Sequence, residues 1–147
     1  MRLETIVPSP QSELRTFVEK QSGQNVLDCY QCGKCSAGCP ADYAMDMGPR
    51  QIMRAIQLGL KKEVLESSTI WLCVSCETCT ARCPAKIEIG RIMESLRWLA
   101  AAEKSKPAER NIKTFHRVFL GVVERFGRVH ELSLAAFYNL LSKHLFA

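Results

Sequence analysis

The sequence lacks the features that would place the chain in a membrane or in a secretory route. Its longest uninterrupted apolar run has five residues, as in 98–102, whereas a helix that crosses a bilayer needs roughly 20. The first five residues, MRLET, do not begin the apolar core of a signal peptide. These absences predict a cytoplasmic protein with no transmembrane segment.

The sequence also lacks the patterns of common catalytic and nucleotide-binding sites. No Ser-His-Asp arrangement, phosphate-binding loop or Rossmann glycine run is apparent. The three histidines are each 14 residues apart, so neighbours would lie about 21 Å apart even on one helix and could not share a metal ion. No catalytic residue is therefore predicted. The hydrophobic fraction of 47% and the charged fraction of 24% are ordinary for a globular chain.

Cysteine is the residue type that the sequence has in excess. Eight cysteines in 147 residues form two copies of the pattern C-x2-C-x2-C-x3-C-P, and each position of the second copy lies 44 residues after its counterpart. Without export, these thiols would stay reduced, so they are predicted to be metal or cluster ligands. The two sets are Cys29, Cys32, Cys35 and Cys39, followed by Pro40, and Cys73, Cys76, Cys79 and Cys83, followed by Pro84.

The spacing favours two 4Fe–4S clusters that share their ligands between the motifs. Three cysteines at steps of three residues can wrap one face of a cubane cluster, and the fourth ligand must come from elsewhere. In two-cluster ferredoxins the last cysteine of this run binds the other cluster. The predicted ligands are Cys29, Cys32, Cys35 and Cys83 for cluster one, and Cys73, Cys76, Cys79 and Cys39 for cluster two.

Zinc and disulfide bonds account for the cysteines less well. Zinc sites usually combine C-x2-C pairs into four tetrahedral ligands, and disulfide scaffolds belong to small secreted chains.

The clusters also change the net charge of the protein. The formal charge is +5, and about −2 per oxidised cluster with its thiolates brings it to about +1. Since the basic residues are also dispersed, no nucleic-acid partner is predicted.

The rest of the chain is predicted to be helical, with no convincing strand, so the fold class is all-α. Apolar residues at helical spacing, with proline and glycine at the ends, predict the helices. Their approximate ranges are 10–22, 49–59, 62–66, 91–103, 107–126 and 132–145. We predict an N-terminal helical extension at 1–27, a two-cluster domain at 28–103 and a C-terminal helical extension at 107–147. The C-terminal helices must pack on each other, dock to a partner protein or lie on a membrane surface.

The motifs and their connector resemble the C subunit of heterodisulfide reductase. The resemblance rests on the paired motifs, the first with its internal glycine, on GPRQIMR at 48–54 and on IWLC at 70–73. It covers roughly residues 28–99, and more loosely the tail through 127–128. It implies an α-helical ferredoxin fold that relays electrons between the flavin and iron–sulfur protein of the complex (the A-type flavoprotein) and its disulfide-reducing catalytic component (the B-type protein). The chain would then work in a hetero-oligomer.

The B-type protein of that family carries CCG motifs, and this sequence has no adjacent cysteine pair. With all eight cysteines used as cluster ligands, no thiol remains for substrate chemistry, so the chain would transfer electrons without catalysing a reaction itself. The ligand pattern is shared by iron–sulfur subunits of succinate or glycerol-phosphate dehydrogenases that feed quinone, although the C-x4-C-x2-C segment of the former is absent. A structural or sensory iron–sulfur protein is the third possibility.

Overall fold

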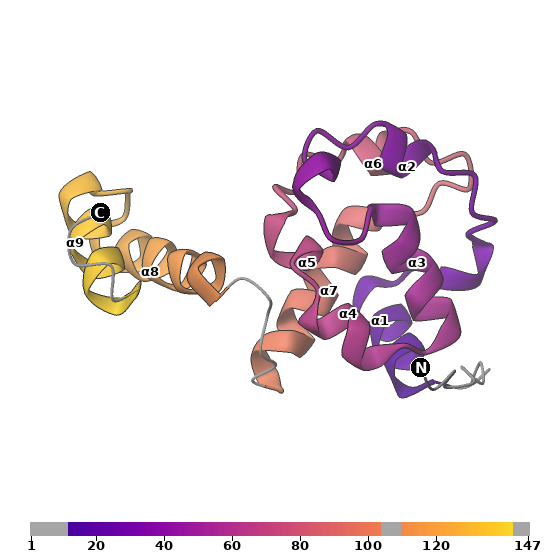
Figure 1. Cartoon of the computed structure of the whole chain (residues 1–147), viewed down its shortest axis with the longest axis horizontal. Helices are drawn as coiled ribbons and strands as arrows, with labels where there is room; N and C mark the ends of the chain where they lie inside the picture. Colours follow the sequence, from indigo (N-terminus) through magenta and orange to yellow (C-terminus); the bar gives the residue numbers. More distant parts are fainter. Residues whose placement is uncertain (1–11, 104–109, 143–147) are drawn as a thin grey trace, which may run out of the picture. The chain divides into compact units, whose positions relative to one another are not determined.

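The computed structural model describes residues 12–103 and 110–142, and this part of the chain contains helices and turns but no strand. The predicted all-α fold is thereby confirmed. The chain divides into two compact units, Met1–Lys106 and Pro107–Ala147, which are shown in Figure 1 and described separately below.

Seven α-helices and two short 3-10 turns make up the described part of the first unit. The helices are α1 (Glu13–Ser22), α2 (Lys34–Ala37), α3 (Pro49–Leu58), α4 (Lys61–Glu66), α5 (Thr69–Leu72), α6 (Thr78–Ala81) and α7 (Ile89–Ala102), and the turns are η1 (Val26–Asp28) and η2 (Asp42–Ala44). The four predicted helices of this unit are confirmed as α1, α3, α4 and α7, with no end shifted by more than three residues. Pro10, where the first was predicted to start, lies outside the described residues.

The ends of α3 show why the connector between the motifs is helical. Pro49 is the first helical residue, and the Gly48 N–H donates to the Gln51 side chain over 2.8 Å. Gly59 ends the helix in the left-handed conformation, with φ of 74°, which costs glycine little. The face between these ends is apolar and buried.

The core of the first unit forms around α7. Helices α1, α4 and α5 pack against it, and α3 packs against α1 and α4 (Figure 1). The largest side chains that are almost fully buried come mainly from these five helices, and most are aliphatic or methionine. They include Leu14, Val18, Ile52, Met53, Ile56, Ile70, Ile92, Met93 and Leu96.

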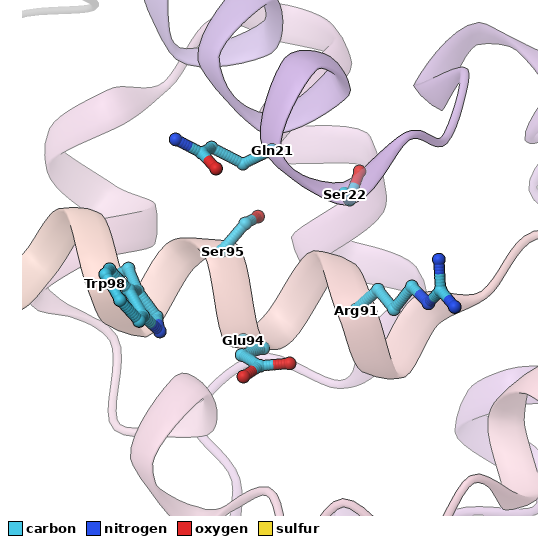
Figure 2. A pocket seen from close by; sticks show the side chains of 6 residues that line it. All are labelled: Gln21, Ser22, Arg91, Glu94, Ser95 and Trp98. Atoms are coloured by element: carbon cyan, nitrogen blue, oxygen red, sulfur yellow. The ribbon is translucent and has the colours of Figure 1, made fainter.

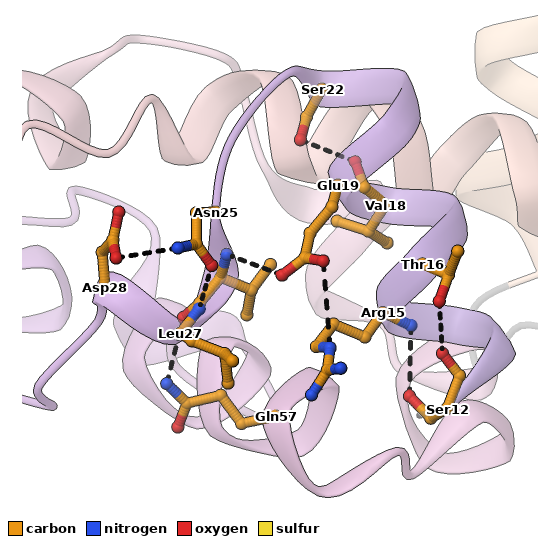
Figure 3. Close-up of polar contacts among 11 residues, drawn as sticks. Ser12, Arg15, Thr16, Val18, Glu19, Ser22, Asn25, Leu27, Asp28 and Gln57 are labelled. Atoms are coloured by element: carbon orange, nitrogen blue, oxygen red, sulfur yellow. Dashed lines mark hydrogen bonds and ion pairs between the residues drawn. The ribbon is translucent and has the colours of Figure 1, made fainter. Parts of the chain in front are cut away.

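A polar network holds the segment that leads from α1 to the first cysteine (Figure 3). Glu19 accepts a hydrogen bond of 3.2 Å from the Val26 N–H, and the Asn25 side chain caps η1. The Gln57 amide, from α3, donates to the carbonyl oxygens of Val26, at 3.0 Å, and of Cys29, at 2.9 Å. Helices α1 and α3 therefore position the start of the first motif.

Asp46 links the segment after the first motif to the helix that leads into the second. Its carboxylate accepts hydrogen bonds from the Ser67 hydroxyl (2.6 Å), the Ser68 N–H (3.0 Å) and the Thr69 N–H (3.2 Å). Burial by itself would raise the pKa of Asp46, but the bonds from these serine and threonine groups outweigh it and hold the pKa well below its ordinary value. The ionised carboxylate acts as a cap for α5.

We expect Asp46→Asn to lower the free energy of unfolding by about 1 kcal/mol at neutral pH, the size of a lost helix cap. Because the folded pKa is depressed, the contribution is fully present above the unfolded pKa of about 3.9 and is lost as the pH falls toward the folded pKa. Denaturant unfolding at pH 7 and pH 3 measures the difference. Glu66→Gln removes the same charge from an exposed residue and is the control. An equal effect of both substitutions would contradict the capping role.

The second unit is a pair of packed helices, α8 (Arg110–Phe126) and α9 (Glu131–Ser142). Gly127 ends α8 with φ of 68°. Both predicted helices are confirmed within the described residues, and their predicted outer ends, at 107 and 145, lie outside them. None of the helices in the described part of the chain combines the length and apolar character that a membrane crossing needs.

Candidate iron–sulfur centre

The two cysteine motifs adopt the same unusual backbone conformation. Gln31 and Ser75 occupy equivalent positions and have φ of 64° and 52°, and the next equivalent pair, Gly33 and Glu77, has φ of 83° and 58°. Left-handed backbone at a residue other than glycine costs on the order of 1–3 kcal/mol and persists only where the surroundings require it. Each loop turns twice in this way before its single-turn helix, α2 or α6, and these helices lie side by side (Figure 1).

The cysteines of each motif differ in their exposure to solvent. The second cysteines, Cys32 and Cys76, are exposed, whereas the third cysteine of the first motif, Cys35, is buried and only 7% exposed. The other five are partly buried, and none of the eight forms a disulfide bond. Each motif therefore presents one ligand to solvent and holds the others further inside.

Burial disfavours the charged form of the inner thiols. It raises the pKa of Cys35 and raises that of Cys79, the equivalent residue, to about 11. At the surface, the hydrogen bond with Thr78 lowers the pKa of Cys76. A metal ligand must be a thiolate, so the inner thiols would be stabilised in that form by the positive charge of bound iron.

The fourth cysteine of the first motif lies beside the second motif. Cys39 lines one pocket together with Cys73, Cys76 and Cys79, and much of the remaining wall is apolar. The other wall residues are Ala41, Met45, Pro49, Val74, Ser75, Glu77, Thr78, Gly90 and Met93. The structure thus brings together the four residues predicted to bind cluster two.

The reciprocal placement is seen at Tyr30, inside the first motif. The pKa of Tyr30 is raised first by desolvation and then by the charges of Cys32, Cys83 and Cys29. Cys83 of the second motif is therefore near enough to act on the same phenol as two cysteines of the first. The charges of Cys29 and Cys32 also raise the pKa of Cys35, after desolvation by burial.

Within residues 12–103 and 110–142, no three His, Cys, Asp or Glu side chains converge tightly enough to hold a single metal ion. A structural zinc site needs four ligands within about 2.3 Å of one ion. A cubane cluster is a larger object, and its four thiolates stand around the cube and bind different irons. The cysteines fit such a cluster in number and chemistry.

Side chains from the core helices hold the backbone of each motif at its first cysteine. On the second motif, the Arg97 guanidinium donates to the carbonyl oxygens of Ile70 (2.6 Å) and Cys73 (2.5 Å) and lies 3.3 Å from the Ser75 hydroxyl. On the first motif, the Gln57 amide donates to the carbonyl oxygen of Cys29 in the equivalent position. Sequence reasoning missed both residues, because neither stands in a recognisable motif.

A second pair of supporting contacts is made by equivalent hydroxyl groups of the two motifs. The Ser36 hydroxyl accepts a 3.0 Å hydrogen bond from the Arg50 N–H at the start of α3, and its equivalent Thr80 accepts one of 3.4 Å from the Gly90 N–H at the start of α7. A Cβ at Gly90 would meet the Glu77 carboxylate, so the end of that side chain would have to move. Each motif is thus tied to the helix that follows it.

Another pocket lies between α1 and α7, and none of its lining residues is a cysteine (Figure 2). It is lined by Gln21, Ser22, Arg91, Glu94, Ser95 and Trp98. Arg91 is paired with Glu88 at 2.6 Å. The chemistry of the cysteines is therefore separate from this pocket.

Comparison with known proteins agrees with this geometry. Residues 28–88 match a family model described as a 4Fe-4S dicluster domain. The iron-sulfur C subunit of the CoB--CoM heterodisulfide reductase of Methanopyrus kandleri is 38% identical over 105 residues, which are 69% of this chain and 55% of the relative. The C subunit of the H(2):CoB-CoM heterodisulfide,ferredoxin reductase of Methanothermobacter marburgensis is 33% identical over 104 residues, or 70% and 56% of the two chains.

A third relative, a protein of Archaeoglobus profundus described as similar to the heterodisulfide reductase C subunit, is 32% identical over 88 residues, or 59% of this chain and 47% of the relative. The chain spans about half the length of the curated relatives it matches.

The fold, the cysteine motifs and the family match define an iron–sulfur protein with an all-α ferredoxin-like domain, whose cysteines suit 4Fe–4S clusters. Within that class, the chain is similar to the C subunit of heterodisulfide reductase over about 70% of its own length. The resemblance predicted from the motifs and the connector is confirmed.

Proposed function

We propose that the chain holds two 4Fe–4S clusters with crossed ligands. Cys29, Cys32, Cys35 and Cys83 would bind the first, and Cys73, Cys76, Cys79 and Cys39 would bind the second. The observation that supports this most directly is the pocket that Cys39 shares with the first three cysteines of the other motif. When bound, such clusters supply one-electron reduction and oxidation. The chain's own groups would position them, through Gln57 and Arg97, and shield their inner sides from water.

The proposed activity is electron transfer without substrate chemistry. All eight cysteines are used as ligands, and no further cysteine exists in the chain. The loops also bring each cluster site to the surface: Cys32 and Cys76 are exposed, and the neighbouring Tyr30 and Val74 are 65% and 67% exposed. Electrons could therefore enter at one motif and leave at the other.

The relatives' names connect this activity with a heterodisulfide reductase. We infer that the chain is the electron-transfer component of such a complex in the cytoplasm, between an A-type flavoprotein and a B-type CCG protein. In this scheme, residues 28–103 are the cluster domain. The segments 1–27 and 107–147 are extensions, of which α1 contributes to the core and the C-terminal pair is available for docking.

We expect anaerobically purified protein to contain about eight irons per chain and to show two reversible one-electron steps in a redox titration followed by EPR. Mixed with its CCG partner, the reduced protein should be reoxidised when that partner's disulfide substrate is added. The partner carrying Ser in place of its CCG cysteines is the matched control. Clusters that do not cycle reversibly would point to a structural or sensory protein. Reoxidation by a quinone analogue and not by the partner would favour the dehydrogenase alternative.

A further inference from the structure

The helical pair α8–α9 exposes an unusual amount of apolar surface. Of the thirteen large apolar side chains that are exposed in the described part of the chain, eight belong to this pair and its connecting turn. Helix α9 buries none of its described residues, and in α8 only Val118 and Val122 are buried among those described. The eight exposed residues are Phe115, Leu120, Phe126, Val129, Leu132, Phe137, Leu140 and Leu141. Such a concentration marks an interaction surface.

Part of this surface is a groove between the two helices. Its walls are mostly apolar, and its lining residues are Val118, Gly121, Val122, Phe126, Phe137 and Leu141, with Arg117 and Arg125. Gly121 borders open space in the groove, because a Cβ built there would meet no atom within 4 Å. A groove between two packed helices is the shape that receives the apolar stripe of a third helix.

The charge of the groove indicates the chemistry of that third helix. Arg117 and Arg125 are exposed, and neither takes part in an ion pair or side-chain hydrogen bond with another described residue. They stand eight residues apart on α8, which is about 12 Å along the axis. Residues 110–142 contain five Lys or Arg and only two Glu. If the α8–α9 pair of a second copy of this chain occupied the groove, two basic helical pairs would face each other and their like charges would repel. The groove is therefore better matched to an acidic partner.

We propose that the α8–α9 groove, defined by the eight residues that line it, binds an amphipathic helix of another protein of the complex, whose apolar stripe is flanked by glutamate or aspartate. Leucine-like side chains would fill the space over Gly121, and carboxylates two turns apart would pair with Arg117 and Arg125. The inference rests on the proposed function only for the expectation that the chain works within a complex.

The test uses the full-length protein with its clusters, under anaerobic conditions and about 150 mM salt, where the screening length is about 8 Å. The probe is a fluorescein-labelled synthetic helix of about 18 residues, or five turns, with leucines on one face and glutamates beside them. The matched peptide has lysines in place of the glutamates. By anisotropy, we expect the acidic peptide to bind at least tenfold more tightly than the basic one.

Two groove variants and one control make the test specific. The double variant Arg117→Glu/Arg125→Glu should weaken binding of the acidic peptide at least tenfold. Gly121→Leu should do so as well, by filling the groove, and leucine is a better helix former than glycine, so the fold should be kept. Arg128→Glu makes one such charge reversal outside the groove lining and should alter binding less than twofold.

Three outcomes would overturn the proposal. The first is equal binding of the two peptides, or a double variant that binds as well as the unmodified protein. The second is a dimer in light scattering that Gly121→Leu dissociates, which would make a second copy the occupant. The third is binding to vesicles rich in phosphatidylserine that exceeds peptide binding. Iron content and the EPR titration are measured on each variant, so loss of peptide binding with intact clusters would leave the proposed function standing.

Discussion

Replacing Cys83 by alanine should remove the cluster of the first motif, although this residue belongs to the second. Cys83 acts on Tyr30 together with Cys32 and Cys29, and its equivalent, Cys39, lies in the pocket of the second motif. A 4Fe–4S cluster needs four ligands. We therefore expect the iron content of Cys83→Ala to fall from about eight to about four per chain, measured by colorimetric iron analysis and EPR spin quantitation.

Matched variants identify which cluster is lost. Cys32→Ala and Cys76→Ala each remove the exposed second cysteine of one motif. Each variant should keep one cluster, so the two EPR spectra give the signals of the two clusters separately. The spectrum of Cys83→Ala should match that of Cys32→Ala, and Cys39→Ala should match Cys76→Ala. If Cys83→Ala instead reproduced the spectrum of Cys76→Ala, each motif would bind its own cluster and the crossed assignment would be wrong.

Removing both clusters should unfold the cysteine loops and destabilise the first unit. Gln31, Ser75 and Glu77 hold left-handed backbone that costs on the order of 1–3 kcal/mol each, which together approaches the roughly 5–15 kcal/mol that stabilises a whole domain. Without iron, only the protein's own hydrogen bonds to the loops offset that cost, and the inner thiols lose the charge that favours their ionised form. We expect chelation under anaerobic conditions to lower the unfolding midpoint by at least about 10 °C, the effect of a few kcal/mol.

Hydrogen exchange measured by mass spectrometry locates the change. Amides in 29–39 and 73–83 should exchange much faster after chelation, and those at the start of α3 and α7, which Ser36 and Thr80 cap, should follow. The α8–α9 pair contains no cysteine and forms a separate unit, so its peptides are the internal control. Unchanged exchange in both motifs would show that the protein holds the loop conformation without metal.

The sequence by itself determined the helices and the candidate ligands. Apolar spacing with Pro49 and Gly59 at the ends predicted α3 to within one residue, because helix boundaries depend on local backbone chemistry. The repeated cysteine pattern predicted the ligand set in the same local way. The single-turn helices α2 and α6 escaped prediction, since four residues are too few to show a helical period.

Only the tertiary structure decided what holds the motifs. Gln57 is 28 residues from Cys29, Arg97 is 24 from Cys73, and Asp46 is 23 from Thr69, so no local pattern joins these partners. The same holds for the groove beside Arg117 and Arg125, which exists only once α8 and α9 pack together. Local spacing specifies which residues can form a helix or bind iron, whereas contacts between distant residues depend on how the helices pack, and packing follows from burial of the whole apolar surface.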